Sequence, residues 1–258
     1  MYATFVKGEI LATDATTAEM VKLMENTTRD VNIAIANEFA RLAEKCGVDV
    51  WEAIRLANLH PRINILSPGP GVGGHCISVD PWFLVETAPE LTPLIYHARR
   101  INDEQPRFVL QKVRHALGDL QGKRIAALGL AYKADVDDLR ESPAIEVVHL
   151  LQQAGALVKA WEPFQPTAEI QGVNMAASLE AGLADAQAII LLVRHTQFVN
   201  LDPRMVATQT PARIVLDCVN GWNSALWENA GFTVHRLGVN KSDLVNQKPL
   251  HRPQGQLS

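Results

Sequence analysis

The longest periodic pattern in the chain is an apolar stripe at helical spacing over residues 17–46. Thr16, followed three residues later by Glu19, has the form of a capping box, and Gly47 supplies a stop. The pattern predicts a single helix of about 30 residues, which would be about 45 Å long. A lone helix of that length needs a partner surface, so it indicates a helical bundle or a dimer interface.

The start of the chain has the pattern of an unfinished unit. Residues 1–6 are typical of the end of an amphipathic helix, and residues 8–13 are typical of a strand. Because a domain rarely opens on half a unit, we expect residues 1–14 to be the remnant of a preceding domain.

A loop interrupts the helical region that follows. Asp49 is expected to cap a second helix that runs to about Leu59. Residues 60–82 are rich in proline and glycine and predict a loop, and a helical pattern resumes over residues 91–117. The helical part is therefore assigned residues 15–118.

From residue 123 onward, short apolar runs alternate with helical segments. The alternation predicts a doubly wound parallel sheet, with ligands at the carboxyl ends of its strands. The predicted fold class is α/β, with a central long-helix dimerisation domain followed by a Rossmann-like domain over 119–240 and a flexible tail over 241–258. The candidate strands are residues 124–130, 157–161, 188–193 and 213–217, and the first two flank a helix over 143–154.

Charge and cysteine content exclude several classes of function. The chain has 24 Lys and Arg against 28 Asp and Glu, a formal net charge of −4, so no nucleic-acid partner is expected. Cys46, Cys76 and Cys218 are few and widely spaced, form no zinc pattern or disulfide framework, and indicate a reducing compartment. Because the chain shows no signal segment and no apolar run long enough to span a bilayer, we expect a soluble cytoplasmic protein with no membrane partner and no metal.

The glycine-rich part of the loop ends at a cysteine. Residues 69–74 match the letters GxGxxG, but no buried strand precedes them and no helix is predicted after them, so we reject a dinucleotide site there. Backbone N–H groups beside consecutive glycines favour a thiolate and an oxyanion, which makes Cys76 a candidate nucleophile. A lone cysteine more often only fills space in a core, and that alternative stays open.

Two other polar segments are candidate ligand contacts. Lys22, Asn26 and Arg29 share one face of the long helix, where they suit an anion or a developing alkoxide; a solvated polar face is the alternative. Because the neighbouring residues are apolar, we expect Lys22 to be buried, and a buried lysine usually has a task. Residues 131–143 follow the first strand of the sheet, where a nucleotide would bind, although an ordinary loop and helix cap fit them too.

In combination these motifs resemble the UDP-glucose/GDP-mannose dehydrogenase family, from residue 1 to about 222. The amino-acid sequences of residues 71–82 and 29–34 resemble those of the UDP-N-acetyl-D-mannosamine dehydrogenase branch. Members have an NAD-binding domain, a central dimerisation domain and a UDP-binding domain, of which the resemblance covers the last two. It is carried by Lys22, Asn26, Asn37-Glu38, Cys76 with Asp80 four residues later, and the segments 128–133 and 138–143.

The resemblance implies an NAD-dependent, four-electron oxidation of a UDP-sugar at C6 to a uronic acid through a thioester, for bacterial surface polysaccharide synthesis. Cys76 would be the nucleophile, Lys22 and Asn26 would stabilise the oxyanion, and Asp80 would activate water. A homodimer and a UDP-sugar substrate are the implied partners, and Arg140 would contact the NAD cofactor. The implied substrate contacts are Lys22, Asn26, Arg29, His60, Arg62, Gly73, Tyr132 and Lys133.

One departure from the family and two rival functions remain. The family often has a cation just after the strand that ends in Asp217, where this chain has Cys218-Val219-Asn220. The first rival is a nucleotide-sugar binding and dimerisation module without catalysis, since this chain alone has no NAD fingerprint. The second, a thiol-dependent hydrolase that pairs Cys76 with His75 or His60, is weaker because the adjacent His75 cannot easily face the thiol.

Overall fold

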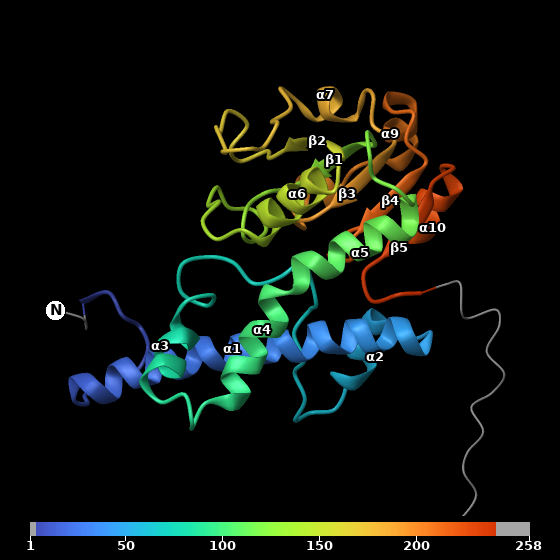
Figure 1. Cartoon of the computed structure of the whole chain (residues 1–258). Helices are drawn as coiled ribbons and strands as arrows, with labels where there is room; N and C mark the ends of the chain where they lie inside the picture. Colours follow the sequence, from blue (N-terminus) through green and yellow to red (C-terminus); the bar gives the residue numbers. More distant parts are fainter. Residues whose placement is uncertain (1–3, 241–258) are drawn as a thin grey trace, which may run out of the picture.

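The structure, a computed structural model, describes residues 4–240, so the predicted tail 241–258 lies outside the described residues. A helical layer built on a long helix lies below an α/β layer (Figure 1). The helical layer contains α1 (Ala15–Cys46), α2 (Val50–Ala57), α3 (Asp80–Thr87), α4 (Pro93–Asp103) and α5 (Gln105–Leu117). The α/β layer contains β1 (Arg124–Leu128), α6 (Pro143–Gln153), β2 (Leu157–Trp161), α7 (Leu179–Leu183), β3 (Ala188–Leu191), α8 (Thr196–Val199), α9 (Pro203–Gln209), β4 (Ile214–Asp217), α10 (Ser224–Asn229) and β5 (Thr233–Arg236).

The long helix is confirmed, but its predicted start was two residues late. Asp14 is the N-cap, and its carboxylate accepts hydrogen bonds from the backbone N–H and the hydroxyl of Thr17. Gly47 ends the helix in the left-handed conformation, as expected, with φ of 66°. The strand expected over residues 8–13 is wrong, because that segment is exposed and makes no strand pairing.

The second helix is capped by Asp49 as predicted, but two other predictions for the helical part were wrong. Residues 80–87 form α3, which begins inside the segment 60–82 that was expected to be a loop. The single helix expected over 91–117 is interrupted at Glu104, because Pro106 has no N–H to continue the hydrogen-bond ladder of α4. The interruption lets α4 pack on α1 while α5 packs on α6, so α4 and α5 together connect the two layers (Figure 1).

Buried polar contacts fix α4 against α1. Arg99 and Asp30 are both buried, and Nη1 of Arg99 donates to Oδ1 of Asp30 at 2.5 Å. Asn102 donates to the same oxygen at 2.8 Å and accepts from Asn37 at 2.9 Å. Burial raises the pKa of Asp30, and the guanidinium of Arg99 opposes that shift. The directional bonds therefore set the register of the helix pair that supports the glycine-rich loop.

The five strands form one parallel sheet in the order β2-β1-β3-β4-β5, which confirms the predicted doubly wound α/β class. Alternate residues of β1 face opposite cores: Ile125 packs with α5 and α6, and Ala126 packs with α7, α9 and α10. Strand β5 escaped prediction because it is short and only Val234 in it is buried. No helix in the range 4–240 is long and apolar enough to cross a membrane.

Candidate active site

The structure brings three of the proposed catalytic residues together where α3 meets α1. The carbonyl oxygen of Cys76 accepts hydrogen bonds from the N–H groups of Val79, at 3.0 Å, and Asp80, at 2.7 Å, so a tight turn joins the thiol to the first residue of α3. Asn26 on α1 donates from Nδ2 to Oδ2 of Asp80 at 2.5 Å. The Cys76 side chain is exposed, so the reading of this residue as core filler is wrong.

Glycines allow the cysteine loop to lie directly on the loop that follows β1. A Cβ on Gly73 would lie 2.3 Å from the carbonyl oxygen of Glu141, and a Cβ on Gly74 would lie 2.8 Å from the ring of Tyr132. The N–H of Gly74 also donates to the carbonyl oxygen of Arg140 at 3.2 Å. Tyr132 and Arg140, two predicted ligand contacts, therefore border the loop that ends at the thiol.

Exposed cations lie on this border. The ammonium of Lys133 lies 5.5 Å from the centroid of the Tyr132 ring. Arg140 forms an ion pair with Asp138 at 2.7 Å, and its hydrogen bonds lower the pKa of the Asp138 carboxyl to about 2. Both cationic side chains are exposed and can reach an anionic ligand.

Lys22 and Arg29 lie one helical turn on either side of Asn26. The expectation that Lys22 is buried is wrong: its side chain is 63% exposed and pairs with Glu25 at 3.4 Å. One of the apolar neighbours on which that expectation rested, Met24, is itself 57% exposed in the single chain. Arg29 is also exposed, so both cations belong to an open face of α1.

His60 and Arg62 are not brought to the thiol. They lie exposed in the turn after α2, where the N–H of Arg62 donates to Nδ1 of His60. The segment that follows this turn is fastened to Asn32 of α1 by two hydrogen bonds, of 2.7 Å and 2.9 Å. Asn32 lies about 120° round the helix from Asn26, so one chain presents these residues on a different face of α1.

Sequence reasoning missed a buried carboxylate and imidazole at the carboxyl ends of the strands. Glu162 directly follows β2, and His195 follows β3 by a few residues; both are completely buried and 3.1 Å apart. The available signal was a polar residue placed directly after an apolar strand, the position where ligand contacts are expected in such a sheet.

Sequence reasoning also missed Arg236, which bears on the cation that the family often has near Val219 and this chain lacks there. The carboxylate of Asp217 accepts the N–H groups of Val219, Gly221 and Trp222, which closes the loop on itself. Arg236, on the unpredicted β5, donates to Oδ1 of Asn220 at 2.7 Å. A guanidinium therefore does reach this loop, from a different strand.

The residues present do not build an NAD phosphate site at the end of β1. The N–H groups of Leu130 and Ala131, which follow that strand, already donate to Glu162. The segment 69–74 follows no strand, and α3 begins only at Asp80, so its rejection as a dinucleotide fingerprint stands. Within residues 4–240, no cluster of His, Cys, Asp and Glu side chains is arranged to hold a metal ion.

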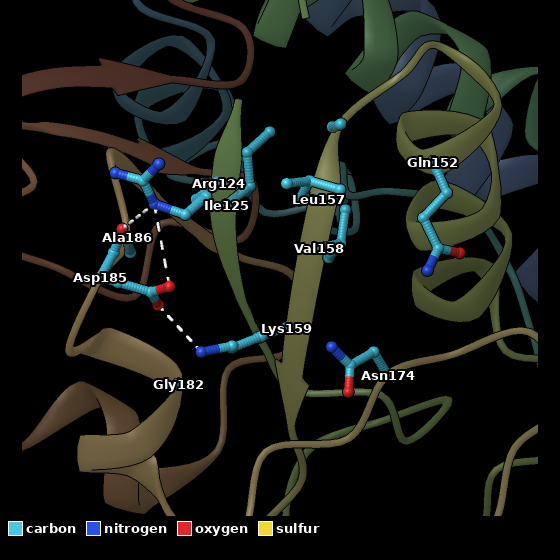
Figure 2. A pocket seen from close by; sticks show the side chains of 11 residues that line it. Arg124, Ile125, Gln152, Leu157, Val158, Lys159, Asn174, Gly182, Asp185 and Ala186 are labelled. Atoms are coloured by element: carbon cyan, nitrogen blue, oxygen red, sulfur yellow. Dashed lines mark hydrogen bonds and ion pairs between the residues drawn. The ribbon is translucent and has the colours of Figure 1, made fainter. Parts of the chain in front are cut away.

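A separate cavity of about 450 Å³ lies beside β1 and β2 on the amino-terminal side of the sheet (Figure 2). Its polar wall is an ion-pair chain in which Asp185 contacts Lys159 at 3.0 Å and Arg124 at 3.8 Å. Since Arg124 begins β1, while the cysteine loop contacts the segment after that strand, this cavity is not part of the candidate active site.

Comparison with known proteins agrees with this geometry. Residues 16–104 match the central domain of the UDP-glucose/GDP-mannose dehydrogenase family, and residues 126–224 match its UDP binding domain. The chain is 49% identical over 245 residues to a UDP-N-acetyl-D-mannosamine dehydrogenase of Methanocaldococcus jannaschii. The aligned region covers 94% of this chain and 56% of that protein. The chain is 48% identical over 227 residues to an NDP-N-acetyl-D-galactosaminuronic acid dehydrogenase of Ralstonia nicotianae, over 87% of this chain and 52% of that protein.

A solved structure gives the same result. The UDP-D-ManNAc dehydrogenase of Pyrococcus horikoshii superimposes with a TM-score of 0.81 at 40% identity, over 93% of this chain and 56% of that one. This chain thus spans about half the length of the curated relatives it matches. Because the two family matches take in both the helical layer and the sheet, the chain belongs to the UDP-glucose/GDP-mannose dehydrogenase family.

Proposed function

We propose that this chain supplies the substrate-binding and thiol-bearing part of an NAD-dependent dehydrogenase that oxidises UDP-N-acetyl-D-mannosamine at C6 to its uronic acid. The observation that carries the proposal is the convergence of Asn26, Asp80 and the Cys76 turn beside Tyr132. The relatives named for this substrate support its identity. A product of this kind serves bacterial surface polysaccharides.

The proposed chemistry on this chain begins with an aldehyde. NAD, when bound, accepts the hydride of each oxidation. The thiolate of Cys76 adds to the aldehyde carbon, and the carbonyl electron pair moves onto oxygen, where Lys22 and the second amide hydrogen of Asn26 stabilise it. Oxidation of this adduct gives a thioester. Water then adds as Asp80 takes its proton, and the thiolate leaves as the uronic acid forms.

The loop after β1 is the proposed site for the uridine diphosphate. Lys133 would offset the diphosphate charge, Tyr132 would contact the nucleotide, and the backbone at Gly73 would approach the sugar. Arg29 is a further proposed substrate contact from α1. Arg140, which is exposed beside the cysteine loop, is the proposed contact to an NAD phosphate.

A homodimer is part of the proposal. Phe39 and Leu42 of α1 are 42% and 54% exposed and line an apolar groove of about 420 Å³, together with residues of α2. A second copy would cover this groove. We infer that such a copy delivers His60 and Arg62 to the substrate, since the segment that follows them is fastened to another face of α1 in one chain.

The remaining parts of the proposal concern organisation and location. We assign residues 1–14 to the end of an NAD-binding domain, 15–118 to the dimerisation domain and 119–240 to the UDP-binding domain. The exposed side chains of Cys46 and Cys76 suit a reducing compartment, so we place the reaction in the cytoplasm.

A binding and dimerisation module without catalysis is the second candidate, favoured by the occupied N–H groups at the end of β1. The two are separated by incubating the whole natural polypeptide with UDP-N-acetylmannosamine and NAD and following NADH. NADH and uronic acid formation supports the dehydrogenase. Binding of the sugar nucleotide without NADH would instead establish the module. Calorimetry on the 258-residue chain should show heat with UDP and none with NAD.

A further inference from the structure

Two buried polar residues, Glu162 and His195, lie at the carboxyl ends of the strands, where a doubly wound sheet is expected to hold its ligand. The strand order reverses between β1 and β3, and ligands of doubly wound sheets bind at the carboxyl ends beside that point. There, Oε2 of Glu162 accepts the N–H groups of Leu130 at 2.7 Å and Ala131 at 2.9 Å. Its other oxygen accepts the N–H of Phe164 at 3.0 Å.

His195 extends this network to the far end of the same loop. Its Nδ1 accepts the N–H of Asp135 at 2.9 Å, so Nε2 carries the hydrogen and donates to Glu162 at 3.1 Å. Asp135 has a left-handed φ of 58°, and its carboxylate accepts the N–H and the hydroxyl of Thr196. Both ends of the loop 130–135 are therefore fixed, with Tyr132 and Lys133 between them.

The network holds the negative charge of Glu162 at a position that is fully buried from solvent. Phe164 and Phe198 flank the imidazole of His195, with ring centroids 5.0 Å and 5.6 Å away. Burial alone would raise the pKa of Glu162, but the hydrogen bonds from His195 and from backbone N–H groups outweigh burial and lower it. A fixed carboxylate at the end of β1 also repels phosphate from N–H groups that could otherwise bind it.

We propose that Glu162 and His195 are positioning residues for nucleotide binding. They fix the backbone of residues 130–135 so that Lys133 meets the diphosphate, and Glu162 keeps the phosphates away from the end of β1. Neither residue touches the ligand. The inference rests on the proposed function, in which Lys133 is the diphosphate contact.

A double-mutant cycle on the full chain tests whether His195 acts through Lys133. UDP affinity is measured by calorimetry for the wild type, His195→Phe, Lys133→Ala and the double variant. We expect His195→Phe to weaken UDP binding about tenfold, which is about 1.4 kcal/mol, in the wild-type background and to have little further effect beside Lys133→Ala. His195→Gln should recover part of the loss, because an amide offers both an acceptor and a donor.

His149→Phe is the matched control, because this half-buried imidazole on α6 contacts the carbonyl oxygen of Gln171 and not the loop. If His195→Phe does not fold, as judged by its melting curve, the exposed Asp135→Ala takes its place in the cycle, since it also frees one end of the loop. An unchanged affinity, or an equal loss in both backgrounds, would overturn the inference. If the wild type itself fails to bind UDP, the proposed function fails, and the inference fails with it.

Discussion

Asn26 and Asp80, 54 residues apart in the chain, are joined by a 2.5 Å hydrogen bond from Nδ2 to Oδ2. The bond ties the first residue of α3 to the buried side of α1, one turn of chain after Cys76. Because an amide has two N–H donors, one remains available to an oxyanion on a thiol-bound substrate. The pair thus couples the proposed general base to the proposed oxyanion donor.

Asn26→Ala in the complete enzyme should lower kcat and leave KM closer to normal. The variant removes an oxyanion donor and also releases the carboxylate of Asp80, and losing one such donor typically costs about 10²–10³ in rate. Steady-state kinetics measures both constants. Thr28→Ala, an exposed change on the same helix, is the matched control. A rise in KM with an unchanged kcat would count against both assigned roles.

Lys22→Ala and Lys133→Ala should affect different kinetic constants. Lys22 is proposed to face charge that develops during the reaction, so its loss should lower kcat by about 10²-fold or more. Lys133 is proposed to face a diphosphate that is charged throughout, so its loss should raise KM. Measured side by side, a change confined to KM in Lys22→Ala would make Lys22 an ordinary phosphate contact.

Strands β1 to β4 and the long helix were predictable because their patterns are long or mostly apolar. Gly47 and Asp49 also gave correct signals, since left-handed and capping positions restrict residue type. Helix α3 was missed because it begins directly after a glycine-rich loop and has no side-chain cap. The interruption at Glu104 did have a signal in the sequence, because Pro106 lies in the middle of the predicted helix and lacks the N–H that a continuous helix requires.

The site was only partly predictable. Cys76 and Asp80 lie close in sequence, but Asn26 meets Asp80 through tertiary packing that no spacing rule encodes. The exposure of Lys22 could not be inferred from its apolar neighbours, because several of them, such as Met20 and Met24, are themselves exposed in a single chain. Glu162 and His195 are separated by a whole β-α-β connection, and only the sheet order brings them together.

Glu162→Gln should destabilise the chain at neutral pH by about 1–3 kcal/mol, because an amide cannot accept every hydrogen bond that the carboxylate accepts. The pKa of Glu162 is lowered from 4.5, so the stability that its charge contributes is present above that value and is lost as pH falls. The difference in unfolding free energy between wild type and variant should therefore shrink below about pH 4.5.

Urea unfolding at several pH values measures that difference. Glu86→Gln, an exposed substitution on α3, makes the same chemical change outside the buried network and should leave stability nearly unaltered. A gap between wild type and Glu162→Gln that stays constant or widens on acidification would contradict the assigned network.

Leu42→Glu should produce a monomer. Leu42 is 54% exposed in the apolar groove between α1 and α2, and a carboxylate there would be buried by a second copy at a large desolvation cost. Leu226 on α10 is 57% exposed and lies outside the groove, so Leu226→Glu is the matched control and should stay dimeric. Sedimentation at tens of micromolar compares them; a monomeric wild type would disprove the proposed dimer.

Cys76 is proposed to carry the substrate between two oxidations, and the NADH yield of Cys76→Ser in the complete enzyme measures that role. A thiolate attacks the aldehyde and leaves the thioester readily, whereas a serine alkoxide is scarcely formed at neutral pH. We predict that Cys76→Ser binds UDP-N-acetylmannosamine with nearly normal affinity but forms no uronic acid, with at most about half the NADH per sugar. Full NADH yield and uronic acid from Cys76→Ser would contradict the account.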